Sequence, residues 1–119
     1  MNEIDDLYER LKKVNEPKGY LLNNDDQLTT GLLKGLLFNR ERYGYMCCPC
    51  RLASGVREQD KDIICPCDYR EEDVAQYGSC YCSLYVTKEW NEGTTPHATI
   101  PERRPPEKSA WGNWPSADA

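Results

Sequence analysis

The sequence has no long run of apolar residues, a single phenylalanine and a single histidine. A helix that crosses a bilayer needs about 20 consecutive apolar residues, so neither a membrane span nor a membrane partner is expected. Residues 1–6 are acidic and lack the apolar core of a secretory signal, which predicts a cytoplasmic protein. The one histidine, His97, lies in a proline-rich segment, and we interpret it as an ordinary surface residue.

Basic charge is scarce as well. Fifteen Lys and Arg residues stand against 20 Asp and Glu residues, so the net charge is −5 and nucleic acid is not an expected partner. The charge is uneven, because residues 34–57 carry five basic residues and one acidic residue, whereas residues 58–89 carry eight acidic and three basic residues. The basic stretch is compatible with two roles, namely steering an acidic electron donor and solvating a helix end.

Cysteine, in contrast, is abundant. Six of the seven cysteines form three Cys-x-Cys units, at residues 48–50, 65–67 and 80–82. In a chain without an export signal this pattern favours metal or redox chemistry over a structural disulfide scaffold, because the cytosol keeps exposed thiols reduced. We interpret the seventh cysteine, Cys47, as a small buried residue in preference to a spare redox thiol.

Apolar periodicity predicts a mainly α fold. Ile4, Leu7 and Leu11 repeat at helical spacing near the start of the chain, and a stripe of leucines follows the potential capping residues 23–26. The predicted helices cover residues 3–15, about 26–42, 57–63 and 71–77, and residues 84–86 are predicted to form a short extended segment.

Each cysteine unit follows one of the predicted helices. Gly44 and Gly78 can adopt the left-handed conformation that ends a helix, and each directs the chain toward a cysteine unit. A domain of this size buries only about 65% of its unfolded surface, so its core is modest. We therefore expect a small single domain, residues 1–90, in which short helices and loops converge on a metal centre that adds stability.

Residues 91–119 differ in composition from the rest. Their prolines prevent a regular helix or a central strand, and tryptophans recur along the segment. We expect an extended arm that aromatic side chains pin to its own domain or to a second copy, and a flexible, disordered segment is the alternative. The residues concerned are Pro96, Pro101, Pro105, Pro106 and Pro115, with Trp90, Trp111 and Trp114.

The short spacing within the cysteine units restricts their sulfurs. In Cys-Pro-Cys the proline holds φ at about −65° and removes an N–H group, so the two sulfurs keep a preset relation. Soft thiolates favour iron–sulfur clusters and zinc over hard cations. Six thiols divide naturally into four that hold one metal centre and two that open and close as a disulfide. A non-enzymatic zinc- or cluster-binding interaction module, with all cysteines structural, is the alternative.

The run from Tyr43-Gly44-Tyr45 through the three cysteine units resembles the catalytic subunit of ferredoxin:thioredoxin reductase, over about residues 20–86. The resemblance implies ferredoxin-dependent reduction of a protein disulfide, on thioredoxin or a thioredoxin-like protein. It also implies a 4Fe-4S cluster held by the first cysteine of the first unit, both of the second and the first of the third. The implied ligands are Cys48, Cys65, Cys67 and Cys80.

The same resemblance implies the roles of the remaining pair. Cys50 and Cys82 would form the redox disulfide, with Cys50 attacking the target and Cys82 staying beside the cluster. Ferredoxin delivers one electron at a time and a disulfide takes up two, so the implied reaction has two one-electron steps and a mixed disulfide. Arg51 and the basic stretch are expected to favour the Cys50 thiolate.

Two features depart from the plant-type pattern. The third unit has Tyr81 where the family has histidine, and we interpret this tyrosine as an aromatic lid that excludes water. Fourteen residues separate Cys50 from Cys65, and twelve separate Cys67 from Cys80. Both departures indicate a divergent prokaryotic branch. Plant-type members pair the catalytic chain with a second small subunit, so either such a subunit or a homodimer is an expected assembly.

Overall fold

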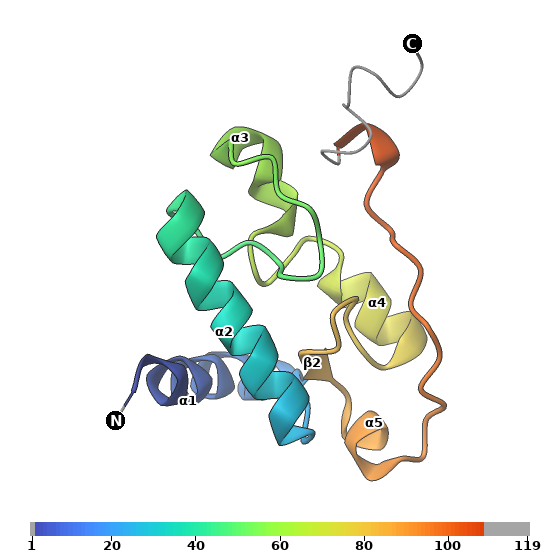
Figure 1. Cartoon of the computed structure of the whole chain (residues 1–119). Helices are drawn as coiled ribbons and strands as arrows, with labels where there is room; N and C mark the ends of the chain where they lie inside the picture. The colour runs from blue at the N-terminus through green and yellow to red at the C-terminus, as the bar shows by residue number, and fades with distance from the viewer. Residues whose placement is uncertain (1, 109–119) are drawn as a thin grey trace.

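A computed structural model describes residues 2–108 of the chain (Figure 1). Its helices and one two-stranded sheet confirm the predicted mainly α fold. No helix in this described part combines the length and apolarity needed to cross a membrane. In chain order the elements are α1 (Glu3–Asn15), η1 (Glu16–Lys18), β1 (Leu21–Leu22), α2 (Asp26–Tyr43), α3 (Arg57–Asp60), η2 (Lys61–Ile63), α4 (Arg70–Tyr77), β2 (Tyr85–Val86), α5 (Lys88–Glu92) and η3 (Pro106–Lys108).

The two long helices begin at the expected polar caps and bury the expected leucines. The side chain of Asn2 accepts a hydrogen bond from the Asp5 N–H at the start of α1, and Asp25 does the same for the Leu28 N–H at the start of α2. Helix α2 crosses α1 in Figure 1. Its stripe of buried leucines and Leu7 of α1 belong to one core, which anchors the rest of the chain.

A short antiparallel pairing joins distant parts of the chain. Strand β1 pairs with β2 in the register Leu21 with Val86 and Leu22 with Tyr85. The extended segment predicted at residues 84–86 therefore exists, while its partner β1 was not predicted. Strand β1 connects α1 to α2 in the chain, and β2 directly follows the third cysteine unit. Their pairing therefore brings that unit close to the two long helices.

Two apolar clusters make up the core. The larger joins α1, α2, α4 and β2, and the smaller lies around the first cysteine unit and η2. Cys82 packs against both clusters, so the third cysteine unit lies at their junction. The buried members are Leu7, Leu22, Leu32, Leu33, Leu36, Val74, Cys80, Leu84 and Tyr85 in the larger cluster, and Tyr45, Cys47, Cys48 and Ile63 in the smaller.

Helix boundaries differ from the prediction in two places. The segment predicted as one helix at residues 57–63 is an α-helical turn followed by a 3₁₀ turn, α3 and η2. Helix α5 was not predicted, because its five residues are too few for an apolar repeat to emerge. Its start is nevertheless capped in the usual way, since the Thr87 side chain accepts from the Trp90 N–H.

The arm after α5 runs back along α4 toward η3 (Figure 1). It packs on its own chain, mainly through charged residues. Arg103 donates to Asp73 Oδ1 of α4 at 2.8 Å, and the Ile100 side chain is buried. The ring of His97, an exposed residue as predicted, stacks on Trp90 with centroids 3.9 Å apart. The predicted aromatic anchors Trp111 and Trp114 lie outside the described residues.

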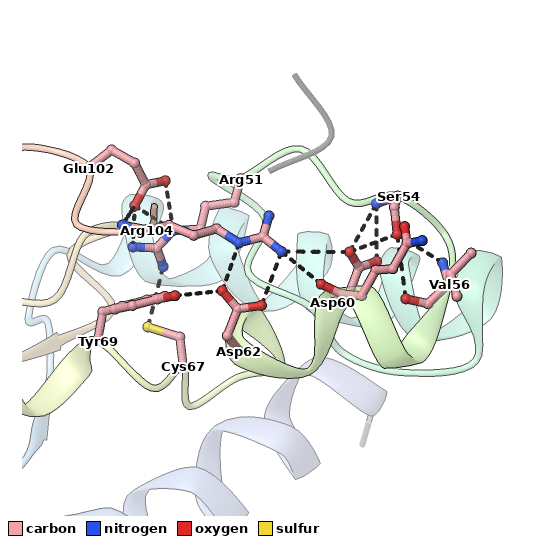
Figure 2. Close-up of polar contacts among 10 residues, drawn as sticks. Arg51, Ser54, Val56, Asp60, Asp62, Cys67, Tyr69, Glu102 and Arg104 are labelled. Atoms are coloured by element: carbon pink, nitrogen blue, oxygen red, sulfur yellow. Dashed lines mark hydrogen bonds and ion pairs between the residues drawn. The ribbon is translucent and has the colours of Figure 1, made fainter. Parts of the chain in front are cut away.

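Arg104 carries the most deeply buried charge of the arm. Its side chain is 1% exposed. Its Nε donates to Asp62 Oδ2 at 2.7 Å, and its Nη2 donates to Asp62 Oδ1 and to the Gln59 carbonyl, both at 3.0 Å (Figure 2). Asp60, also buried, lies 3.9 Å from the same guanidinium. The arm is thus joined to α3 and η2 by a buried ion-pair network.

Hydrogen bonds keep both carboxylates of this network ionised. Burial by itself raises the pKa of Asp60, but the Tyr45 hydroxyl, at 2.5 Å, and the Ser54 N–H donate to it, and the net pKa lies below the ordinary value. Burial likewise opposes ionisation of Asp62, but Arg104 and the Tyr69 hydroxyl together bring its net pKa below the ordinary value. The further donors are the Gly55 N–H on Asp60 and the Tyr69 hydroxyl on Asp62.

Replacing Arg104 tests whether the buried network anchors the arm. The change Arg104→Gln leaves two buried carboxylates without their cation and should lower the free energy of unfolding by about 3 kcal/mol. Arg40→Gln is the matched control, because Arg40 pairs with Glu3 at 3.0 Å on the surface, and its loss should cost less than about 1 kcal/mol. Urea denaturation measures both, and equal losses would contradict the assignment.

The same network predicts loss of stability in acid. Asp60 and Asp62 have folded pKa values below the unfolded value of about 3.9, so their stabilisation is present above that pH and is lost as the pH falls through the folded values. The unfolding free energy should therefore decline steeply below about pH 4. In Asp60→Asn the decline should be shallower, and an unchanged slope would remove Asp60 from the explanation.

Candidate metal centre and redox site

Two glycines end the helices that precede cysteine units. Gly44 follows α2 with φ of 89°, and its N–H donates to the Arg40 carbonyl. Gly78 follows α4 with φ of 83°, and its N–H donates to the Val74 carbonyl. These left-handed residues reverse the chain toward the first and third units, as predicted, because a side chain is rarely tolerated at such φ values.

Backbone hydrogen bonds then hold the units to one another. The Cys48 N–H donates to the Ile63 carbonyl and the Cys65 N–H donates to the Met46 carbonyl, both at 2.8 Å. The Cys80 N–H donates to the Tyr85 carbonyl at 2.9 Å. The first unit is therefore tied to the second, and the third is tied to β2, before any side-chain interaction is considered.

A close approach of α2 fixes the first unit further. A Cβ atom added at Gly35, in the middle of α2, would lie 2.7 Å from Cβ of Pro49. Only glycine permits this contact without a shift of the Cys-Pro-Cys backbone. Gly31, one turn earlier on the same helix, has nothing within 4 Å of the corresponding position.

The four cysteines predicted as ligands line one cavity. Cys82, predicted as half of the redox pair, lines it with them. Cys50 does not line this cavity; it is exposed and lines a separate surface pocket with Tyr81 and the arm. Cys47 is fully buried in the smaller core cluster, in keeping with its interpretation as a packing residue. The cavity is lined by Cys48, Arg51, Cys65, Cys67, Arg70, Cys80, Tyr81, Cys82 and Tyr85.

The cysteine predicted to attack and the one predicted to resolve are neighbours. All seven cysteines are free thiols, and the Cys50 and Cys82 thiols lie close enough for each to shift the pKa of the other. Hydrogen bonds from Cys48 and then from Cys82 lower the pKa of Cys50 to about 4, while hydrogen bonds to Cys48, Cys50 and Cys80 raise the pKa of Cys82. The Cys82 Sγ is 3.8 Å from the Cys80 Sγ. Cys82 thus lies between an outward-facing thiol and the cavity.

Polar groups also reach the sulfurs in the cavity. The Tyr85 N–H donates to Cys80 Sγ at 3.3 Å, and Arg51 Nη1 donates to Cys67 Sγ at 3.3 Å. Burial raises the pKa values of Cys65 and Cys67, so these thiols bind a metal with release of their protons. Donors to ligand sulfurs are a common means of tuning metal–thiolate centres.

Arg51 is held on three sides. Its Cζ lies 4.5 Å from the ring centroid of Tyr81 and 5.2 Å from that of Tyr69. Its Nε and Nη2 donate to the carboxylate of Glu102 in the arm, the shortest contact being 2.8 Å (Figure 2). Arg51 was predicted to act on Cys50; its hydrogen bonds go instead to Cys67 and Glu102, although its charge also favours the Cys50 thiolate.

Glu102 is a site residue that sequence reasoning missed. It lies in a segment whose prolines identified it only as an arm.

The basic residues at 34–57 do not form one exposed surface. Arg51 has a buried side chain, Arg40 pairs with Glu3, and Arg42 lies 5.0 Å from the ring centroid of Tyr43. Steering of an electron donor by this stretch stays a prediction.

A family model described as the ferredoxin thioredoxin reductase catalytic beta chain matches residues 1–104. The chain belongs to this family. No curated protein matches the chain at a significant level. The match to the reductase family extends beyond the predicted resemblance at both ends, and it includes the arm as far as Arg104. The arm residues that contact the cysteine region are therefore within the family pattern.

Membership of the reductase family establishes the broad activity. The chain is an oxidoreductase that acts on disulfides, and its cofactor is a 4Fe-4S cluster. The cavity fits such a group, because its walls supply several thiols and two hydrogen-bond donors to sulfur. Within residues 2–108 no three potential ligands lie at the spacing of a single metal ion. The sulfurs stand around the cavity instead.

The contact between Gly35 and Pro49 leads to a paired prediction. Gly31→Ala should raise the free energy of unfolding by about 0.5–1 kcal/mol, since alanine is the better helix former and meets open space. Gly35→Ala should instead lower it by about 1–3 kcal/mol and reduce the iron bound per chain, because Pro49 must move between Cys48 and Cys50. Urea denaturation and iron analysis measure these effects. Equal stabilisation by both changes would contradict the close approach.

Proposed function

We propose that this chain takes electrons from reduced ferredoxin and reduces the disulfide of thioredoxin or a thioredoxin-like protein. The observation that carries the proposal is the division of the cysteines between two sides of the site. Five line an internal cavity, and Cys50 alone of the paired cysteines opens to a surface pocket. A buried electron source and an exposed thiol are the two elements that such a reaction needs.

The proposed ligands of the cluster are Cys48, Cys65, Cys67 and Cys80. They come from three loops, and backbone hydrogen bonds join the first loop to the second and the third to β2, so the cluster would bind to a largely preformed site. When bound, it would supply electrons one at a time. Arg51 and the Tyr85 N–H would then stabilise negative charge on two of the ligand sulfurs.

Cys50 and Cys82 are proposed to be the redox pair. Each cycle takes up two single electrons and two protons: the first electron opens the Cys50–Cys82 disulfide and frees the Cys50 thiolate, and the second lets Cys82 complete the reaction. The Cys50 thiolate then attacks one target sulfur and forms a mixed disulfide, while the other target sulfur leaves and takes up a proton. Cys82 next attacks the Cys50 sulfur, which releases the second target thiol and restores the Cys50–Cys82 disulfide. The order follows from exposure, because Cys50 faces the surface and Cys82 faces the cavity.

Tyr81 separates the two sides in this proposal. It lines both the internal cavity and the pocket beside Cys50, and it stacks with Arg51. Burial raises the pKa of its hydroxyl, so it stays protonated near neutral pH. We propose that its ring keeps water from the cavity, at the position where the family has histidine. The lid role stays a prediction.

We propose that the protein works in the cytoplasm, where exposed thiols stay reduced between reaction cycles. Residues 1–90 are proposed as the helical reductase unit and residues 91–119 as its arm. A homodimer or a small second subunit stays a prediction.

Three serine variants test the division of the cysteines. Cys50→Ser should keep its iron and lose thioredoxin reduction by several orders of magnitude, since no nucleophile remains. Cys65→Ser should lose iron and stability, because its thiolate connects separate loops. Cys47→Ser, as a buried control outside the cavity, should keep both iron and activity. Proteins prepared without air are compared by iron content, absorption spectrum and reductase rate with reduced ferredoxin.

The same measurements separate the enzyme from a non-enzymatic module. A colourless protein that holds zinc and reduces no disulfide would support an interaction module with structural cysteines. Loss of iron in Cys50→Ser would contradict the assignment of Cys50 as a non-ligand.

A further inference from the structure

The pocket beside Cys50 has the arm as one of its walls. Its lining consists of the Cys50 thiol, the Tyr81 ring, Ser83 and the arm residues 98–100. None of the lining residues other than Cys50 carries an ionisable side chain that is charged near neutral pH. The pocket therefore offers no ion-pair partner, and any recognition at this place depends on shape and on hydrogen bonds.

The backbone of the arm is available at this wall. Among the described residues, no hydrogen bond is made by the backbone N–H or C=O groups of Ala98, Thr99 or Ile100. Residues 94–103 have no helix or strand, and both Ala98 and Thr99 are exposed. An extended segment with unpaired backbone groups is a template for pairing with another extended chain.

Anchors on both sides hold this segment in place. On one side His97 stacks on Trp90, and its Nε2 lies 3.0 Å from the Trp90 carbonyl oxygen. On the other side Glu102 pairs with the buried Arg51. Between them the Ile100 side chain is buried, so the segment is fixed while its backbone stays uncovered. Such preorganisation lowers the entropy cost of binding.

Ser83, another residue of this pocket, has an unusual backbone conformation. Its φ of 67° is the left-handed conformation, and it is the one residue other than glycine with positive φ in the described chain. The residue directly follows Cys82, and the turn is held by the Ser83 N–H on the Cys80 carbonyl at 2.9 Å. Strain of this kind persists where the surrounding structure requires it.

We propose that residues 98–100 of the arm form a docking strip for the target protein. The occupant is the uncharged, extended segment that carries the target disulfide, and it pairs with the strip through backbone hydrogen bonds. The pairing would place the target disulfide beside the Cys50 sulfur. This inference rests on the proposed attack by Cys50, and it adds the surface and the class of segment that are recognised.

The test uses the holoprotein with Cys82→Ser, in which attack by Cys50 leaves a stable mixed disulfide. Two probes are compared, oxidised thioredoxin and the small disulfide dithiodipyridine. In this background Thr99→Pro removes one N–H from the strip, and Thr99→Ala keeps it. Proline suits an extended segment that already contains Pro96 and Pro101.

The proline variant should form the thioredoxin adduct about five- to tenfold more slowly, as expected for loss of one backbone hydrogen bond. Its rate with dithiodipyridine should be unchanged, and Thr99→Ala should match the parent with both probes. An unchanged thioredoxin rate in Thr99→Pro would overturn the docking strip alone. No thioredoxin adduct in the parent would overturn the proposed function, and the strip with it.

Hydrogen exchange measured by mass spectrometry gives a second readout that needs no substitution in the arm. Amides of residues 98–100 should exchange rapidly in the free Cys82→Ser protein and in its dithiodipyridine adduct. They should become protected in the thioredoxin mixed disulfide. Formation of that adduct without protection of these amides would overturn the inference even if Thr99→Pro failed to fold.

Discussion

The buried guanidinium of Arg51 connects the cysteine-lined cavity to the C-terminal arm. One of its nitrogens donates to the Cys67 sulfur, and two others donate to the Glu102 carboxylate. The Arg51 side chain is 1% exposed, and a charge buried to this degree is costly unless it is paired. Without the arm, this buried cation would lose its carboxylate partner, Glu102. The arm therefore belongs to the electrostatics of the site as well as to its surface.

The placement of the cysteines follows from the two core clusters. Cys80 is buried in the larger cluster and Cys48 in the smaller, and Cys82 packs against both. The cavity therefore forms where two apolar clusters meet, with little room for water. Cys50 lies just past the edge of the smaller cluster, since Pro49 is held against α2 at Gly35. One Cys-Pro-Cys unit can in this way present one thiol inward and the other outward.

Local sequence signals predicted what local interactions determine. The helix ends at Gly44 and Gly78 depend on residues within one turn, and the cysteine units could be sorted from their motif and its resemblance to a known family. Strand β1 and helix α5 could not be predicted, because each is short and its stability comes from elsewhere. β1 has two residues and pairs with a strand more than sixty positions later. No periodicity within β1 records such a partner.

Glu102 shows why the rest of the site was hidden from sequence reasoning, and it also shows which pattern identifies such a residue in other chains of this kind. In an extended segment, side chains two positions apart point to the same side. Glu102 and Arg104 accordingly face the first cysteine unit and η2, while Arg103 between them faces α4. The three charged residues between Pro101 and Pro105 therefore have different partners on the two sides of the arm. The proline content predicted only an arm, whereas the alternating direction of these charged side chains determines how the arm binds.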